Sequence, residues 1–184
     1  MKTKFAVLCL AIVATSAPML IAGSKDPMVG GAAMYASKDI IDNAVNSKDH
    51  TTLVAAVKAA GLVDTLKGPG PFTVFAPTNE AFAKLPAGTV ETLLKPENKE
   101  MLTKILTYHV VAGRISAAEL KKQIREGNGQ AALKTVSGGT LIAMLQGSSI
   151  VLKDEKGGMS TVTIPNVFQS NGVIHVVDAV VLPN

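Results

Sequence analysis

The chain has 184 residues, with 18 Lys and Arg against 14 Asp and Glu, and its formal net charge at pH 7 is +4. This length favours a single domain and is sufficient to bury a core without disulfides or a metal. A hydrophobic share of 47% and a charged share of 17% exclude a largely disordered chain, and the small net charge argues against a nucleic-acid-binding protein.

The first residues combine a short basic start with an apolar run. Lys2 and Lys4 precede residues 5–22, which contain no charged side chain. This pattern is typical of a secretory signal peptide, which we expect over residues 1–22. The alternative is a retained membrane anchor, but a Thr, a Ser and a Pro interrupt the run, and about 20 apolar residues are needed to span a bilayer.

Removal of this segment would change the composition of the remaining chain. The mature protein would keep 16 Lys and Arg against 14 Asp and Glu, and it would lose Cys9, the only cysteine. Thiol catalysis and Cys-ligated metals are then excluded together, and we expect a secreted or periplasmic protein that uses no disulfide.

The first half of the mature chain carries helical patterns around one strand. Residues 23–36 are rich in Gly, Ala and Met without a clear period, so we expect a flexible segment there. Apolar residues then recur at helical spacing near residues 40–45 and 53–60, with Gly61 as a stop. Residues 72–76 are predicted to form a buried strand, which ends at Pro77.

Further helices are predicted between residues 78 and 126. Thr78 is a candidate N-cap for a short helix, and residues 97–108 form the longest stretch with helical periodicity. Ser116 and Glu119 have the spacing of a capping box, which predicts another helix start.

Beyond residue 131 the period becomes that of strands. Strands are predicted at residues 133–136, 141–145, 150–152, 160–164 and 173–182. Both faces of the last strand are apolar, so we expect it to lie centrally in a sheet. Helices followed by strands, without βαβ alternation, predict an α+β fold with a mainly antiparallel sheet. We expect one domain over residues 37–184.

Three ordered segments resemble signature segments of the fasciclin domain family. Residues 73–82 (TVFAPTNEAF) resemble its first block, residues 171–178 (NGVIHVVD) its second, and residues 105–111 (ILTYHVV) its Tyr-His segment. The resemblance implies a β-wedge of two mainly antiparallel sheets packed with several helices. It also implies a secreted or surface-anchored, often adhesive protein, and the chain is similar to small bacterial single-domain members.

The signature residues have a structural and a functional interpretation. We favour core and turn roles, which the apolar and turn-forming residue types indicate, for Phe75, Pro77, Thr78, Asn79, Phe82, Asn171, Gly172 and His175. The resemblance to animal members would instead place Tyr108 and His109 on an adhesive surface. For His109 we favour a buried ring that hydrogen-bonds the backbone.

The animal adhesion mechanism also needs an Asp-Ile pair shortly before the second block. The matching residues here are Asn166 and Val167, so the acidic group is missing. Asn166 and Val167 therefore stand as candidate partner-binding residues beside Tyr108 and His109, without the carboxylate that could complete a metal site on a partner.

Motifs of enzymes and of nucleic-acid-binding proteins are missing from the sequence. His50, His109 and His175 lie far apart without metal-ligand spacing, and GxSxG, GxGxxG and GxxxxGK[ST] do not occur. We expect no catalytic residue, no metal and no cofactor. The basic residues near position 122 are flanked by Glu119 and Glu126, which favours a solvated helix face over a nucleic-acid contact.

Two functions are consistent with the sequence. The first is a non-catalytic interaction or adhesion module that binds a protein, matrix or cell-surface partner, with membrane contact only through an uncleaved signal peptide. The alternative is an extracytoplasmic binder of an apolar small molecule, such as a carotenoid or lipid. Side chains that could adapt to such a ligand are Met101, Ile142, Met144, Leu145 and Met159.

Overall fold

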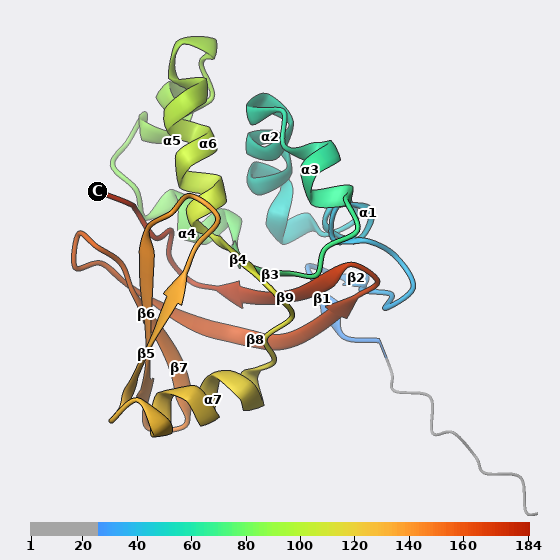
Figure 1. The fold of residues 1–184 in the computed structure, drawn as a ribbon. Coiled ribbons are helices and arrows are strands. Elements are labelled where there is room, and N and C mark those ends of the chain that lie inside the picture. The colour runs from blue at the N-terminus through green and yellow to red at the C-terminus, as the bar shows by residue number, and fades with distance from the viewer. Residues whose placement is uncertain (1–25) are drawn as a thin grey trace, which may run out of the picture.

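The computed structural model describes residues 26–184, and the predicted signal peptide lies outside the described residues (Figure 1). Up to residue 108 the elements are β1 (Met28–Val29), β2 (Ala32–Ala33), α1 (Ile40–Ala44), η1 (Lys48–His50), α2 (Thr51–Ala60), α3 (Val63–Lys67), β3 (Phe72–Pro77), α4 (Asn79–Ala83), α5 (Thr89–Leu93), η2 (Pro96–Asn98) and α6 (Lys99–Tyr108). They are followed by β4 (Val110–Ala112), α7 (Ala117–Glu126), β5 (Gln130–Lys134), β6 (Thr140–Gln146), β7 (Ser149–Lys153), β8 (Met159–Gln169) and β9 (Gly172–Val177).

The segment expected to be flexible is a packed hairpin in its described part. Strands β1 and β2 pair through a turn in which Gly30 and Gly31 have φ angles of 59° and 76°. Val29 and Met34 are 3% and 2% exposed and belong to the core beneath the helices. The expectation for residues 23–36 was wrong here because two anchoring side chains are too few to produce a period.

Local signals of helix ends are confirmed. Thr78 Oγ1 accepts a hydrogen bond from the Ala81 amide (3.2 Å), and Ser116 Oγ accepts one from the Glu119 amide (3.2 Å). Gly61 follows α2 in the left-handed conformation, with φ at 73°. These side-chain caps satisfy amides that a helix N-terminus leaves free, and the glycine allows the backbone to turn after a C-terminus.

The large sheet has the strand order β4-β3-β9-β8-β7-β6-β5. Strand β9 pairs in parallel with β3, whereas the other neighbours are antiparallel. The long strand β8 has register shifts between residues 162 and 167, and it belongs to both halves of the sheet. Figure 1 shows β5, β6 and β7 running across the direction of β8 and β9, which forms a wedge.

The α+β class and the wedge are therefore confirmed, with three differences in detail. The two halves form one continuous sheet through β8, and a bridge between Val111 and Thr135 brings the sheet's two ends together. The predicted central strand is central, but it ends at Val177 and lies parallel to β3. Strand β4, which has only three residues, was not predicted.

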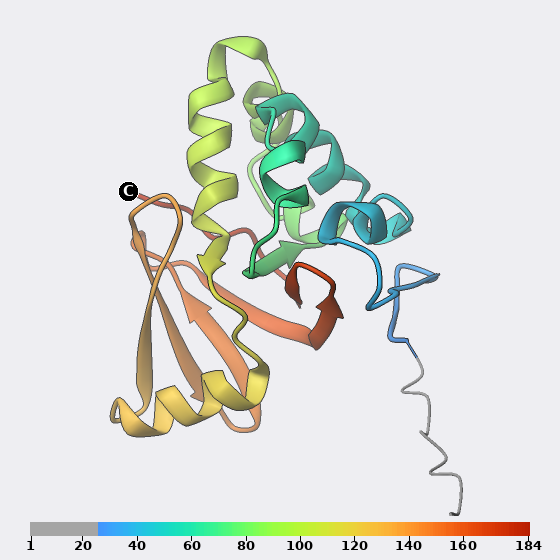
Figure 2. The same ribbon diagram turned by 45° about the vertical axis from the view of Figure 1, so that its right-hand side comes forward.

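Two apolar cores occupy opposite faces of β3 and β9, as strand alternation requires. On one face Val74 and Ile174 pack against side chains from α1 to α6. On the other face Phe75 and Val177 lie inside the wedge, together with Leu120 and Ile124 of α7. Figure 2 shows α7 across the lower end of β5–β7 and the remaining helices gathered above the sheet.

Candidate functional site

Tyr108, the last residue of α6, lies inside the wedge rather than on its surface. Its side chain is fully buried, and its hydroxyl donates to the Thr140 carbonyl (2.7 Å) and accepts from the Glu155 amide (3.3 Å). Burial raises the pKa of this hydroxyl to about 12. The phenol thus connects α6 to the β6 start and to the turn that follows β7.

Replacement of Tyr108 by Phe is expected to lower the free energy of unfolding by about 1–2 kcal/mol, because the Thr140 carbonyl and the Glu155 amide lose this buried partner. Urea unfolding measures the change. Tyr35→Phe is the matched control, since Tyr35 is 45% exposed and should change stability by less than about 0.5 kcal/mol. Equal effects of the two substitutions would contradict the role assigned to the Tyr108 hydroxyl.

His109 follows Tyr108 and has both ring nitrogens paired with the backbone. Nδ1 donates to the Ile105 carbonyl (2.8 Å), and Nε2 accepts from the Val181 amide (3.2 Å). This pairing requires the neutral ring with its proton on Nδ1. Burial lowers the pKa of His109 to about 4. The ring therefore joins the end of α6 to the C-terminal segment after β9.

His175, in β9, is also buried and also has both ring nitrogens paired with the backbone. Its Nε2 donates to the Ile115 carbonyl (2.9 Å), its Nδ1 accepts from the Asn166 amide (3.3 Å), and burial lowers its pKa. The Phe75 ring stacks on it with 5.7 Å between centroids. Asp178 does not orient this ring, because its carboxylate accepts from the Thr161 amide instead (2.7 Å).

Asn166 and Val167 also serve the interior. Asn166 has a φ of 60°, and its side-chain oxygen accepts from the Ala117 amide (2.7 Å) at the start of α7. Val167 is 1% exposed and belongs to the core beneath the helices. An isolated Asn adopts the left-handed conformation more readily than most residues.

The partner-binding interpretation of these four residues is therefore corrected. Tyr108, His109 and Val167 are at most 2% exposed, and Asn166 uses its side chain to hold α7. A buried side chain cannot contact a partner in this conformation. A buried ring is the placement that the sequence favours for His109. For Tyr108 the sequence alone does not distinguish the two placements, because an aromatic residue at a helix end suits a surface as well as a core.

The first signature block joins two helices to β3. Pro77 ends β3, and Thr78 caps α4. The Asn79 side chain accepts from the Thr52 amide (3.0 Å) and donates to the Lys48 carbonyl (2.8 Å), which ties α4 to the start of α2. Phe82 of α4 is 7% exposed and packs in the core beneath the helices.

The second block joins segments that are more than 100 residues apart in sequence. The Asn171 side chain accepts from the Ile40 amide (3.1 Å) and donates to the carbonyls of Leu66 (2.7 Å) and Gly68 (3.0 Å). Gly172 has no room for a side chain, since a Cβ there would lie 2.2 Å from the Phe72 carbonyl oxygen. Both signature blocks thus contribute to packing and to chain connections.

Two acidic residues that no sequence pattern singled out hold the C-terminal segment. Asp154, which is 6% exposed, accepts hydrogen bonds from the amides of Gly158 (2.6 Å) and Leu182 (2.9 Å). Glu155 accepts from the amides of Thr140 (2.8 Å) and Asn184 (3.2 Å), and these bonds lower its pKa. The Asp-x-x-Gly-Gly spacing signals the turn, but not the contact with residue 182.

An internal cavity of about 40 Å³ lies between α1, α2 and the helix-facing side of β3 and β9. Its lining is almost entirely apolar and includes Val29, Met34 and His50, whose Nε2 finds no hydrogen-bond partner within the described residues. This volume suits a few water-sized molecules, whereas small-molecule pockets usually reach about 300 Å³ or more. A carotenoid or lipid chain does not fit in this cavity.

The residues that motivated the apolar-ligand alternative do not surround this cavity. Met101 and Met159 are 57% and 58% exposed, on α6 and β8 respectively. Leu145 packs toward the wedge interior, whereas Ile142 and Met144 are partly exposed on β6. The five side chains therefore lie on several surfaces and form no common pocket.

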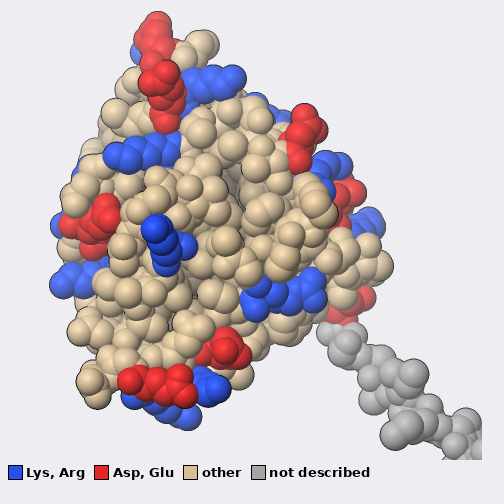
Figure 3. Space-filling model, in the orientation of Figure 1, with Lys and Arg blue, Asp and Glu red and all other residues tan. Residues whose placement is uncertain are grey.

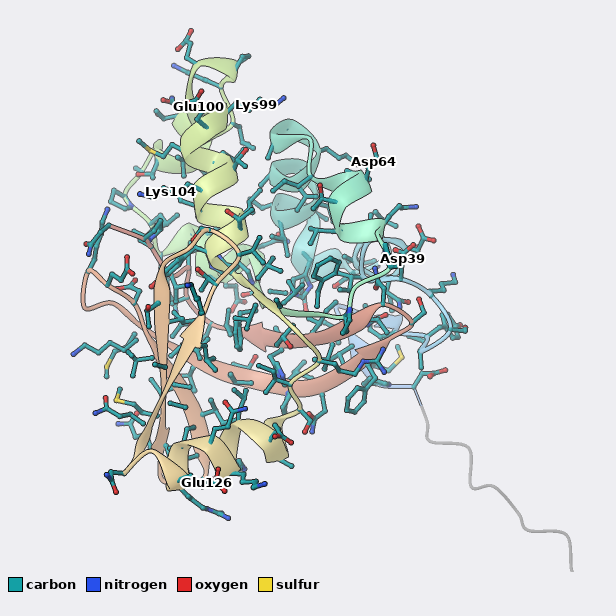
Figure 4. All side chains as sticks on the ribbon, viewed as in Figure 1. Asp39, Asp64, Lys99, Glu100, Lys104 and Glu126 are labelled. Atoms are coloured by element: carbon teal, nitrogen blue, oxygen red, sulfur yellow. The ribbon has the colours of Figure 1, made fainter. Side chains whose placement is uncertain are left out.

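The charged groups are dispersed. Among residues 26–184, no group of three or more His, Cys, Asp or Glu side chains is placed to hold a metal ion. Figure 3 shows Lys and Arg interspersed with Asp and Glu around a largely uncharged centre. Figure 4 labels charged residues that do not converge on one site: Asp39 caps α1, Asp64 lies on α3, Glu126 lies on α7, and Lys99, Glu100 and Lys104 follow one another along α6.

The basic residues of α7 are placed as a solvated helix face. Lys122 and Arg125 are exposed, and Lys122 lies 4.0 Å from Glu126 on the same helix. Such exposed pairs contribute little to stability or to attraction of an anion. In the described part of the chain, none of the helices is both long and apolar enough to cross a membrane.

Comparison with known proteins gives a consistent result. A family model described as "Fasciclin domain" matches residues 48–183. The chain is similar to protein sll1483 of Synechocystis (48% identical, covering 86% of this chain and 81% of that protein) and to the cell surface glycolipoprotein MPB83 of Mycobacterium bovis (32% identical, 91% and 79%).

Among solved structures, the chain resembles a FAS1 domain pair from the insect cell adhesion molecule Fasciclin I. The TM-score is 0.70 and the sequence identity is 20%, and the match covers 79% of this chain and 51% of that one. At 20% identity this similarity supports the fold alone.

Proposed function

Because the chain belongs to the fasciclin domain family, we propose that it acts outside the cytoplasm as a non-catalytic interaction module that binds a protein, matrix or other cell-surface partner. The family is associated with cell adhesion and extracellular interaction. One relative is named a cell surface glycolipoprotein, and the fold neighbour belongs to a cell adhesion molecule. The basic start and apolar run of residues 1–22 support export.

The observation that carries the proposal is that the side chains best suited to acid-base chemistry are buried. Tyr108, His109 and His175 are buried, and their hydrogen-bonding atoms are paired with the backbone. Catalysis needs such groups at an accessible position where a substrate can meet them. Because these groups are engaged in the interior of the fold, we expect the protein to act through recognition at its exposed surface.

Retention on the surface of source cells tests this function. Labelled protein purified from its source is added to cells that lack their own copy, and bound label is measured against added concentration. We expect saturable retention that unlabelled protein displaces. Label that stays in solution, or that binds without saturation, would count against the proposal.

Native mass spectrometry of the same preparation distinguishes the interaction module from the alternative function, which is binding of an apolar small molecule. The interaction module is expected at the mass of the polypeptide or of a complex with a macromolecule. A stoichiometric small molecule of a few hundred daltons, removed by organic extraction, would favour the alternative.

A further inference from the structure

The strands β5–β8 have an outer face that belongs to neither core. Their inward residues, such as Leu133, Leu141 and Leu152, lie in the wedge interior. By strand alternation the intervening residues point to the opposite side. This side, called here the outer sheet face, consists of Gln130, Ala132, Lys134, Thr140, Ile142, Met144, Gln146, Ser149, Val151, Lys153, Met159 and Thr161.

The centre of the outer sheet face is apolar. Met144, Val151 and Thr161 are neighbours across three strands, and Ala132, Ile142, Lys153 and Met159 form the adjacent row. Val151 is only 3% exposed although it belongs to neither core, since its neighbours flank it. Met159 is 58% exposed and Ile142 and Met144 are partly exposed, so this cluster meets solvent.

Within the described residues, α7 is the helix that packs against β5, β6 and β7, and it does so from inside the wedge. The outer sheet face thus keeps an uncovered apolar centre. Four strands about 4.8 Å apart and five residues long give the outer sheet face, polar residues included, an area of about 300 Å². This is less than the about 800 Å² that each partner buries in a standard interface, so the face would form the centre of the contact and the surrounding surface its rim.

The charge of the outer sheet face has one sign. Lys134 and Lys153 are its charged residues, whereas Asp154, Glu155 and Lys156 lie in the turn between β7 and β8 that borders it. Lys153 lies between Ile142 and Met159 in the strand register, so its stem can cover apolar surface while its ammonium group stays at the edge. A complementary surface carries apolar side chains bordered by carboxylates.

We propose that the outer sheet face is the surface through which this chain binds another protein, and that the partner presents apolar side chains bordered by Asp or Glu. The inference rests on the proposed function and names the contact surface for it. A second copy of the chain fits less well, because it would bring lysines toward lysines without acidic partners. Two lysines also provide little attraction to an anionic membrane.

Two synthetic peptides test the chemistry of the partner. One alternates Leu with Glu, and the other has Lys in place of each Glu. NMR titration of the isotope-labelled protein is expected to show that the Glu peptide shifts amides of residues 142–144, 151–153 and 159–161, whereas the Lys peptide does not. Equal responses to both peptides, shifts confined to another surface, or no shifts would overturn the proposal.

Met159→Glu and Met101→Glu form a matched pair of variants. Both methionines are exposed to nearly the same degree, 58% and 57%, but Met101 lies on α6. Met159→Glu and Lys153→Glu are each expected to weaken binding of the Glu peptide by about fivefold or more, and Met101→Glu to leave it unchanged. Circular dichroism checks that each variant is folded.

The same variants distinguish a protein partner from two other occupants of the outer sheet face, namely a second copy of the chain and an anionic membrane. Sedimentation that shows a dimer abolished by Met159→Glu, or phosphatidylglycerol vesicles that bind with the same dependence on residue 159, would overturn the protein-partner proposal. If labelled protein is retained on cells but Met159→Glu has no effect on retention, the proposed function stands and the outer sheet face is wrong. If retention is absent while the peptide result holds, the proposed function fails instead.

Discussion

Acidification from pH 7 to pH 4 is expected to lower the free energy of unfolding by at least about 3 kcal/mol. His109 has its pKa lowered by burial from 6.5 to about 4 in the folded protein. Between these values the unfolded chain binds more protons than the folded one, so stability is complete above about pH 6.5 and is lost as the pH falls toward 4. A difference of this size corresponds to about 3 kcal/mol for His109.

The other buried histidines act in the same direction. Burial lowers the pKa of His50 and of His175. A proton on Nδ1 of His175 would meet the Asn166 amide, and a proton on Nε2 of His109 would meet the Val181 amide. Urea unfolding at several pH values measures the total effect. Stability that stays constant between pH 6.5 and 4.5 would contradict the buried neutral state of these rings.

His109→Ala isolates the contribution of that residue. At pH 7 the variant is expected to lose several degrees of melting temperature, because the Val181 amide loses its partner and a cavity remains at the end of α6. Its further loss on acidification should be smaller than that of the parent protein by up to about 3 kcal/mol, since the titrating ring is gone. An unchanged melting temperature would show that the ring does not hold the C-terminal segment.

The sequence predicts best those parts of the fold that depend on neighbouring residues. The caps at Thr78 and Ser116 and the stop at Gly61 involve contacts within four residues, and all three are confirmed. Strand β4 and the hairpin of β1 and β2 are too short to produce a period. The parallel pairing of β3 with β9 joins segments about 100 residues apart, which no local pattern specifies.

The candidate site was predicted less well for a related reason. Whether Tyr108 and His109 point inward depends on the carbonyl of Thr140 and the amide of Val181, both supplied by distant segments. The local sequence likewise does not predict which side chains of β6 belong to the outer sheet face. Alternation along residues 140–146 separates two sets of side chains, but only the packing of α7 against Leu141 and Ala143 identifies the inner set.

Gly172→Ala is expected to lower the free energy of unfolding by about 3 kcal/mol or more. The added Cβ would lie 2.2 Å from the Phe72 carbonyl oxygen and 3.0 Å from Ile40 Cδ1. The first of these neighbours is backbone of β3, which is held in register with β9, so the clash cannot be relieved by rotating a side chain. Relief requires β3 and β9 to separate near Asn171, whose side chain holds Ile40, Leu66 and Gly68.

Gly147→Ala provides the control for this substitution. Gly147 lies in the turn between β6 and β7 with a φ of 63°, and a Cβ there meets nothing within 4 Å. Its substitution is expected to cost only about 1–2 kcal/mol, the strain of a left-handed conformation. Chemical denaturation of the two variants compares steric exclusion with conformational strain. If Gly172→Ala is no more destabilising than Gly147→Ala, the close approach of β3 and β9 is not a constraint, and Gly172 must be present in the signature block for another reason.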